Sequence, residues 1–226
     1  MPKARPPVNY DGTPHRYLLR RGTQLWRVHP QAYGAFEFNA RLSDPLWDGA
    51  RFDATAADKY PYLYAGLSDV TALAETLLRD IASDERGYRV VPNDKALGRR
   101  ISRLTLTQDL GLVSLIDGRD LGAIGQDDWL VSCPPRDYPQ TRDWVHWLRR
   151  AAPRTHGLIW DSKRDRGGLA LVLFGDRIAS DFGDGYENTL PREVTQAAAD
   201  LGQADGLSWA NERLRPYRAV ISPPLA

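Results

Sequence analysis

Residues 62–77 read YLYAGLSDVTALAETL, and this stretch decides the fold because it joins a strand pattern directly to a helix pattern. Residues 62–67 are apolar and aromatic between a proline and a serine, which favours a strand. After Ser68, apolar residues recur at spacings of three and four, which predicts a helix over residues 69–83 with this serine as its N-cap. The chain therefore carries a strand and an amphipathic helix in direct succession.

Further strand patterns lie on both sides of this stretch. Residues 24–28 alternate between apolar and polar side chains, as a half-buried strand does. Residues 101–107 interleave apolar side chains with Arg and Thr, and residues 112–116 follow after a turn, so we expect these two strands to pair in antiparallel fashion. Residues 157–160 and 169–174 are short apolar runs bounded by glycines, which is typical of central strands.

Two more helices complete the pattern. Thr141 is a candidate N-cap for a helix over residues 142–151, and the proline at position 153 helps to end it. A last helix is expected near residues 192–201. Because strands and helices do not alternate regularly, we predict an α+β fold, with one mixed or antiparallel sheet and flanking helices.

The chain length indicates one domain. Residues 1–22 contain four prolines and no clear periodicity, so we expect an extended arm outside the core. Residues 23–226 are expected to form a single domain, with its core over about 23–176 and a C-terminal extension over about 177–226. No internal repeat is visible.

Composition excludes several function classes. The net charge of +1 gives no overall field that would attract nucleic acid directly. No apolar run has the 18 or so residues of a membrane span, and the charged, proline-rich start does not resemble a secretory signal, so we expect a cytoplasmic protein. Cys133 is the only cysteine and the four histidines lack metal-like spacing, so we expect neither a disulfide nor a metal site.

Polar residues stand out inside the apolar stretches. Arg51, Tyr64 and Glu75 fall within 25 residues, and the cluster WDSKRDRGG at residues 160–168 directly precedes the apolar run at 169–174. Together they look like two walls of one cleft. Taken singly, each has a structural interpretation as well, because strand tyrosines usually pack and arginines beside aromatics often bury their stems.

Glu75 illustrates these alternatives. At 100° per residue it lies off the centre of its helix's apolar stripe. It is therefore solvated, paired with Arg79 four residues on, or aimed into a cleft.

Read in order, the motifs resemble the RES domain, the toxin component of bacterial RES-Xre toxin–antitoxin pairs, which is named for its Arg, Glu and Ser residues. The matching motifs are Trp26-Arg27, Gly49-Ala50-Arg51-Phe52-Asp53, Tyr64 with Glu75 eleven residues later, and Asp161-Ser162 before two glycines and an apolar strand. The resemblance covers about residues 23–176. Ala50 stands where the family commonly has a second glycine, and Asp161 stands where proline is frequent.

The resemblance implies a fold similar to ADP-ribosyltransferases and an enzyme that degrades NAD. NAD would be the substrate, no cofactor would be needed, and inorganic phosphate would be the co-substrate if the nicotinamide N-glycosidic bond is broken by phosphorolysis instead of hydrolysis. It also implies a cognate Xre-type antitoxin as partner, and the sequence leaves a homodimer open. Two alternatives remain, namely an ADP-ribosyltransferase that modifies a protein, and a non-enzymatic interaction or nucleic-acid-binding module.

The residues carried over by the resemblance have chemically sensible roles. Glu75 would stabilise the cationic ribose, Arg27 and Arg51 would grip the pyrophosphate, and Tyr64 would flank the nicotinamide. Ser162 would anchor ribose or phosphate from the wall opposite the glutamate. Two neighbouring cations, Lys163 and Arg164, are candidates for an anion-binding rim.

Overall fold

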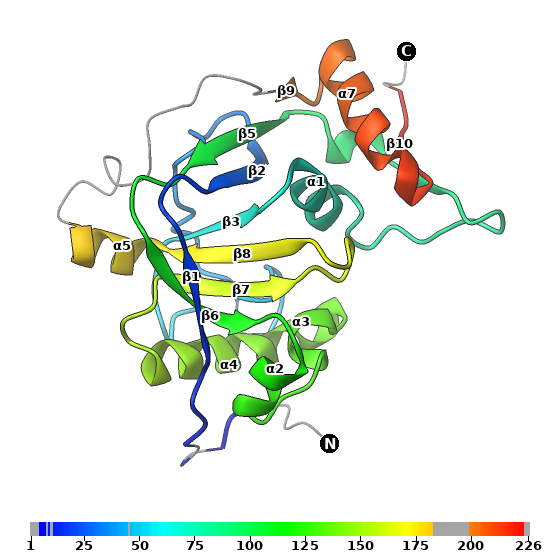
Figure 1. Ribbon diagram of the computed structural model, residues 1–226. Helices are drawn as coiled ribbons and strands as arrows, with labels where there is room; N and C mark the ends of the chain where they lie inside the picture. Colours follow the sequence, from blue (N-terminus) through cyan, green and yellow to red (C-terminus); the bar gives the residue numbers. More distant parts are fainter. Residues whose placement is uncertain (1–4, 8, 10, 45, 183–198, 224–226) are drawn as a thin grey trace.

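The computed structural model describes residues 5–7, 9, 11–44, 46–182 and 199–223 (Figure 1). The strands are β1 (Arg16–Leu19), β2 (Gln24–Pro30), β3 (Tyr62–Gly66), β4 (Arg89–Val91), β5 (Arg99–Thr105), β6 (Leu110–Leu115), β7 (Gly157–Asp161), β8 (Leu169–Phe174), β9 (Ala199–Asp200) and β10 (Ala219–Ile221). The helices are α1 (Asp69–Leu77), α2 (Gly118–Ala123), α3 (Trp129–Ser132), α4 (Tyr138–Ala151), α5 (Gly175–Phe182) and α7 (Ala204–Leu214).

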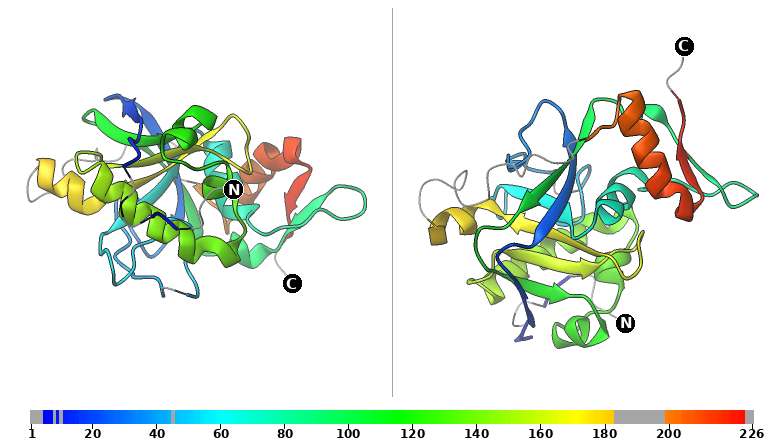
Figure 2. Two further views of the ribbon diagram at one scale, coloured as in Figure 1. Left: turned by 90° about the horizontal axis from the view of Figure 1, so that it is seen from below. Right: turned by 45° about the horizontal axis from the view of Figure 1, so that its top comes forward.

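Eight of these strands form one sheet in the order β1-β6-β7-β8-β3-β2-β5-β9. Its pairs are antiparallel except β6 with β7, and β4 pairs in parallel with β10 in a separate two-stranded sheet. Helices α2, α3 and α4 lie together along one side of the large sheet (Figure 1). Helix α7 contacts α1 and β10 at another end of the molecule (Figure 2). The predicted α+β class with one mixed sheet is confirmed.

The sheet is almost divided between β2 and β3. These strands pair only at Trp26 and Gly66, whereas β2 pairs with β5 along its full length. The β1–β6 ladder leads into the β2–β5 ladder through two backbone bonds, from Gly22 N–H to the Leu106 carbonyl (2.8 Å) and from Leu106 N–H to the Thr23 carbonyl (2.9 Å). One bent ribbon therefore joins the two ends of the sheet, and its β2–β5 part diverges from β3.

Strand β3 lies at the centre and buries both of its faces. Tyr62 and Tyr64 face the apolar cluster that includes Trp144 of α4, and Leu63 faces the cluster that includes Ile178 of α5. This alternation follows from the two-residue repeat of an extended chain. The site side chains on β3 are thus held by a strand that is packed on both sides.

Helix α1 begins where the sequence predicts and ends earlier. The Ser68 hydroxyl accepts a hydrogen bond from Thr71 N–H at 3.0 Å, which is the expected cap. The helix stops at Leu77 instead of residue 83 because Asp80 takes a φ of 61°, a left-handed conformation that a right-handed helix cannot include. Its apolar side, with Leu73, packs against α7.

Several sequence predictions need correction. Helix α4 begins at Tyr138, and Thr141 does not cap it, because its hydroxyl donates to the Tyr138 and Arg51 carbonyls (3.0 and 2.7 Å). The pairing predicted between the strands now numbered β5 and β6 is wrong, since the short link between them passes from one end of the sheet to the other. Leu19 is 2% exposed, so the segment predicted as an arm contributes β1 to the sheet and core.

The helix predicted near 192–201 falls mostly outside the described residues, and Ala199–Asp200 form β9. In the described part of the chain, no helix combines the length and apolar character needed to span a membrane.

Gly157 provides a test of the packing between β7 and β8. A Cβ at this position would lie 2.0 Å from the Val172 carbonyl oxygen, so Gly157→Ala must push two central strands apart. We expect it to lower the free energy of unfolding by at least about 2 kcal/mol. Gly122 in α2 has no atom within 4 Å of an added Cβ, so Gly122→Ala should be neutral or stabilising by up to about 1 kcal/mol. Urea unfolding measures both, and equal effects would contradict this packing.

Candidate active site

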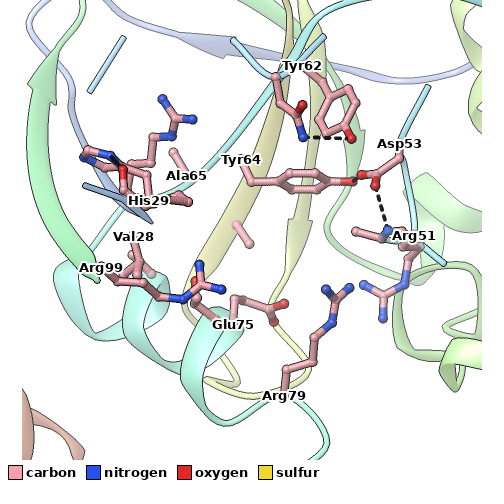
Figure 3. A pocket seen from close by; sticks show the side chains of 18 of the residues that line it. Val28, His29, Arg51, Asp53, Tyr62, Tyr64, Ala65, Glu75, Arg79 and Arg99 are labelled. Atoms are coloured by element: carbon pink, nitrogen blue, oxygen red, sulfur yellow. Dashed lines mark hydrogen bonds between the residues drawn. The ribbon is translucent and has the colours of Figure 1, made fainter. Parts of the chain in front are cut away.

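A cavity of about 640 Å³ opens where β2 and β3 diverge (Figure 3). Its walls come from β2, from residues 39–41 and 48–53, from β3, and from α1 with the residues just after it. Trp160 of β7, Ala170 of β8, and Lys95 and Arg99 near the start of β5 complete the lining.

Positive charge dominates this cavity. Six cationic side chains line it, against three carboxylates, which leaves an excess of three positive charges. The cations are Arg27, Arg41, Arg51, Arg79, Lys95 and Arg99, and the carboxylates are Asp48, Asp53 and Glu75. Burial and nearby Arg27 lower the pKa of His29, which also lines the cavity. This imidazole is therefore mainly neutral at pH 7 and is not counted among the cations. A concave surface of this sign concentrates anions.

Glu75 reaches the cavity from the second turn of α1, and Ser162 stands directly behind it. The Ser162 hydroxyl donates to Glu75 Oε1 at 2.5 Å and accepts from the N–H groups of Arg164 (3.1 Å) and Asp165 (3.0 Å). Because both hydroxyl lone pairs accept hydrogen bonds, the hydroxyl proton must point at the glutamate. Because Ser162 is fully buried and touches Glu75, its predicted position across the cleft from the glutamate is wrong.

A second link ties α1 to the loop between β7 and β8. Thr71 lies one helical turn before Glu75, and its hydroxyl donates to Asp165 at 2.5 Å. The other oxygen of Asp165 accepts from Tyr217 at 2.5 Å. Residues four apart share a helix face, so both links hold the same side of α1 against this loop. Glu75 is therefore fixed in position by contacts on the side away from the cavity.

The predicted anion rim does not line this cavity. Lys163 donates to the carbonyl of Ser132, and Arg164 lies 3.7 Å from Asp80. Both cations belong to the loop behind Glu75, and the cations of the cavity come from other elements.

Tyr64 lines the cavity with a hydroxyl that is already engaged. The hydroxyl donates to Asp53 Oδ1 (2.9 Å) and accepts from Phe52 N–H (3.0 Å). Burial, reinforced by the Asp53 carboxylate, raises the pKa of this phenol well above its ordinary value, so it stays neutral. Its ring meets Tyr62 and Trp160 edge to face, with centroids 5.8 and 6.3 Å apart.

Asp53 holds the loop that carries Arg51. Its second oxygen accepts from the Ser43 hydroxyl (3.0 Å) and from Ala50 N–H (2.7 Å), and it is only 5% exposed. Sequence reasoning quoted Asp53 inside the arginine motif without giving it a role. Its position two residues after Arg51 was the one sequence signal that could have indicated a role in holding this loop.

Arg142 of α4 organises the same loop and was not anticipated. It is 1% exposed and donates to three backbone carbonyls, those of Asp44 (2.5 Å), Ala50 (3.1 Å) and Asp48. These hydrogen bonds order the loop before Arg51 and place Arg51 at the cavity wall. No local sequence signal distinguishes it from an ordinary helix arginine.

Arg27 on β2 is buried and lines the cavity from the opposite side. It donates to the carbonyls of Gly34 (3.3 Å) and Ala35 (2.7 Å). Burial lowers the pKa of its guanidinium to about 10, so it remains charged at neutral pH. The cavity thus brings together four of the five predicted residues, and the fifth, Ser162, supports Glu75 from behind. Within the described ranges, no cluster of His, Cys, Asp or Glu could hold a metal ion.

The chain was compared with protein families, curated proteins and solved structures. The family model described as RES domain matches residues 24–211, which extends past the predicted core into α7. A search of curated proteins finds no match. Among solved structures, the chain is similar to one in the crystal structure of the M. tuberculosis MbcT-MbcA toxin-antitoxin complex, with 13% identity and a TM-score of 0.48 over 78% of this chain and 85% of that one.

Tyr64→Phe should change how stability depends on alkaline pH. Above pH 10 the unfolded phenol loses its proton while the buried one keeps it, so the unfolded state binds fewer protons and the free energy of unfolding falls. Without the phenol, this fall should become shallower by up to about 1.4 kcal/mol per pH unit. Urea unfolding at several pH values between about 9 and 12 measures the slope. The same slope in parent and variant would mean that the phenol ionises in the folded protein.

Proposed function

The chain belongs to the RES domain family, and we propose that it is an enzyme that breaks the bond between nicotinamide and ribose in NAD. The observation that carries this proposal is Glu75, a carboxylate held by a buried serine inside a cavity with excess positive charge. NAD has matching charges, a dianionic pyrophosphate and a cationic pyridinium ring joined to ribose. A binding site for NAD therefore needs cations beside the pyrophosphate and a fixed carboxylate beside the nicotinamide ribose.

Binding would begin with the cationic walls. The cavity volume of about 640 Å³ lies within the range of small-molecule sites. Arg27 and Arg99 lie on the β2–β5 side, where planar guanidiniums can bind pyrophosphate oxygens in pairs. Because Arg27 also donates to two loop carbonyls, it would shape the wall while contributing charge.

Glu75 would act on the bond that breaks. As the C1′–N bond lengthens, its electron pair moves to the pyridinium nitrogen, nicotinamide leaves as a neutral ring, and positive charge develops on ribose C1′. A carboxylate about 4 Å from that charge, at an effective dielectric of about 20, stabilises it by roughly 4 kcal/mol, or about a thousandfold in rate. Oε1 is engaged by Ser162, and within the described part of the chain no partner is recorded for Oε2, which leaves that oxygen for ribose.

Tyr64 would provide the nicotinamide end of the site. Its ring lies beside Trp160, and its phenol is neutral, so the Tyr64 side chain provides an aromatic surface without charge next to the Asp53 carboxylate that holds it. An aromatic wall suits a leaving group that becomes neutral and excludes water from it.

The proposal includes the biological setting that the family resemblance implies. As the toxin of a RES-Xre pair, the protein would be restrained by an Xre-type antitoxin that covers this cavity. The cytoplasmic location and the absence of a cofactor stay predictions.

Incubation with NAD, with and without inorganic phosphate, tests the function. We expect release of nicotinamide, together with ADP-ribose phosphate when phosphate is the acceptor or ADP-ribose when water is, and mass analysis identifies which. Glu75→Gln should lower kcat/KM by about 100- to 1000-fold, because it removes the charge and keeps an acceptor for Ser162.

Glu212→Gln provides the matched control, since Glu212 is 73% exposed on α7 and does not line the cavity. It should act like the parent. Intact NAD after incubation with the parent would exclude the proposed function, and full activity of Glu75→Gln would exclude the proposed mechanism.

Ser162→Ala tests whether this serine positions Glu75 or binds substrate. Loss of a hydrogen bond to a charged group costs about 1.5–3 kcal/mol, so we expect kcat to fall by roughly 10- to 100-fold. The KM for NAD should change by less than about threefold, because Ser162 is fully buried behind the glutamate. Steady-state kinetics separate the two parameters. A raised KM with an unchanged kcat would show that the hydroxyl contacts NAD directly.

A further inference from the structure

We propose that Arg51 and Arg79 form a separate anion site that binds the inorganic phosphate attacking ribose, so that Arg79 selects phosphate over water as the acceptor. This inference rests on the proposed function and names its second substrate. The site lies beside Glu75, on the side where α1 and α4 meet the arginine loop.

The two guanidiniums are brought together by one aromatic ring. The Cζ atoms of Arg51 and Arg79 each lie 5.3 Å from the ring centroid of Tyr138, the first residue of α4. They are therefore no farther apart than twice that distance. Both line the cavity, and Figure 3 shows both side chains extending toward the space in front of Glu75.

Within the described residues, neither arginine is paired with a carboxylate. Arg51 is 6% exposed, and among the residues that the structure describes its buried Nε has no hydrogen-bond partner, while Arg79 donates only to the Tyr138 hydroxyl at 3.3 Å. Among the described residues, no ion pair within 4.0 Å involves either of them, so the alternative that Glu75 pairs with Arg79 is not realised. Two like charges held close together in a partly desolvated place favour an anion between them.

Arg149, elsewhere on α4, shows how the same protein satisfies such a cation. It is also 6% exposed and stacks on aromatic rings, with its Cζ 4.0 Å from the centroid of Tyr60. In contrast to Arg51, it pairs with two carboxylates, Asp58 (2.8 Å) and Asp176 (2.7 Å). The missing partner of the Arg51–Arg79 pair is thus expected to come from a ligand.

The position of the pair identifies the ligand as a second anion beside NAD. In Figure 3, Arg99 lies on one side of Glu75, and Arg51 and Arg79 lie on the other. NAD has a single pyrophosphate, which Arg27 and Arg99 would bind. Arg51, expected from the resemblance to bind pyrophosphate, is then available for a second anion. The Arg51–Arg79 pair lies next to Glu75, the carboxylate that would face C1′. A phosphate that attacks C1′ must bind at this place.

The reaction balances without a further reactant. One unprotonated oxygen of inorganic phosphate, which carries such oxygens both as H₂PO₄⁻ and as HPO₄²⁻, forms a bond to C1′ while the C1′–N bond breaks and its electron pair goes to the nicotinamide nitrogen. The products are neutral nicotinamide and ADP-ribose phosphate. No general base is needed, because the attacking oxygen carries no proton.

Phosphate binding and acceptor choice test the inference together. Isothermal titration with inorganic phosphate alone should show a Kd at least about tenfold higher for Arg79→Gln than for the parent, because one of two charge-assisted contacts is lost. With NAD and phosphate present, the ratio of ADP-ribose phosphate to ADP-ribose should fall by about tenfold, while the KM for NAD changes by less than about threefold.

Arg218→Gln is the matched control, because Arg218 also lies over a tyrosine ring, that of Tyr88 at 4.4 Å, but outside the cavity. It should match the parent in both measurements. Arg79→Lys keeps the charge and should bind phosphate with intermediate strength.

Three results would separate the possibilities. Equal phosphate affinity in Arg79→Gln and the parent overturns the inference, as does no phosphate binding by the parent even if it hydrolyses NAD. Arg79-dependent phosphate binding by a parent that leaves NAD intact supports the anion site and excludes the proposed function.

Discussion

The near-absence of pairing between β2 and β3 is the constraint on which the site depends. A full ladder between these strands would close the sheet, but they meet only at Trp26 and Gly66. The reason lies outside the site, in the bent ribbon that continues from β1 and β6 into β2 and β5. Because that ribbon diverges from β3, side chains of both strands reach one cavity in the middle of the sheet.

Buried polar side chains then fix what lines this cavity. Ser162 and Asp165 hold α1, Asp53 holds Tyr64, and Arg142 holds the loop before Arg51, each through hydrogen bonds. Buried donors and acceptors are costly when unpaired, so these networks specify one arrangement. The exceptions are the arginines stacked on Tyr138, whose charges face the cavity unpaired.

Periodicity predicts the strands and the start of α1, and the order of short motifs predicts which residues share a site. The features that these patterns do not predict depend on contacts between residues far apart in the sequence. Ser162 and Glu75 are 87 positions apart, so only the fold shows that they touch. Arg142 acts on backbone carbonyls, which have no sequence signature. The β5–β6 pairing was mispredicted because neighbours in sequence were assumed to be neighbours in the sheet.

The central claim is that the Glu75 carboxylate faces the nicotinamide ribose of NAD. A crystal structure of Glu75→Gln with intact NAD tests this most directly, since the variant should bind substrate and cleave it slowly. We predict ribose C1′ within about 4 Å of the side chain at position 75, the distance at which a carboxylate stabilises the developing charge. NAD bound with its nicotinamide ribose elsewhere, or a cavity left without NAD at saturating concentration, would contradict it.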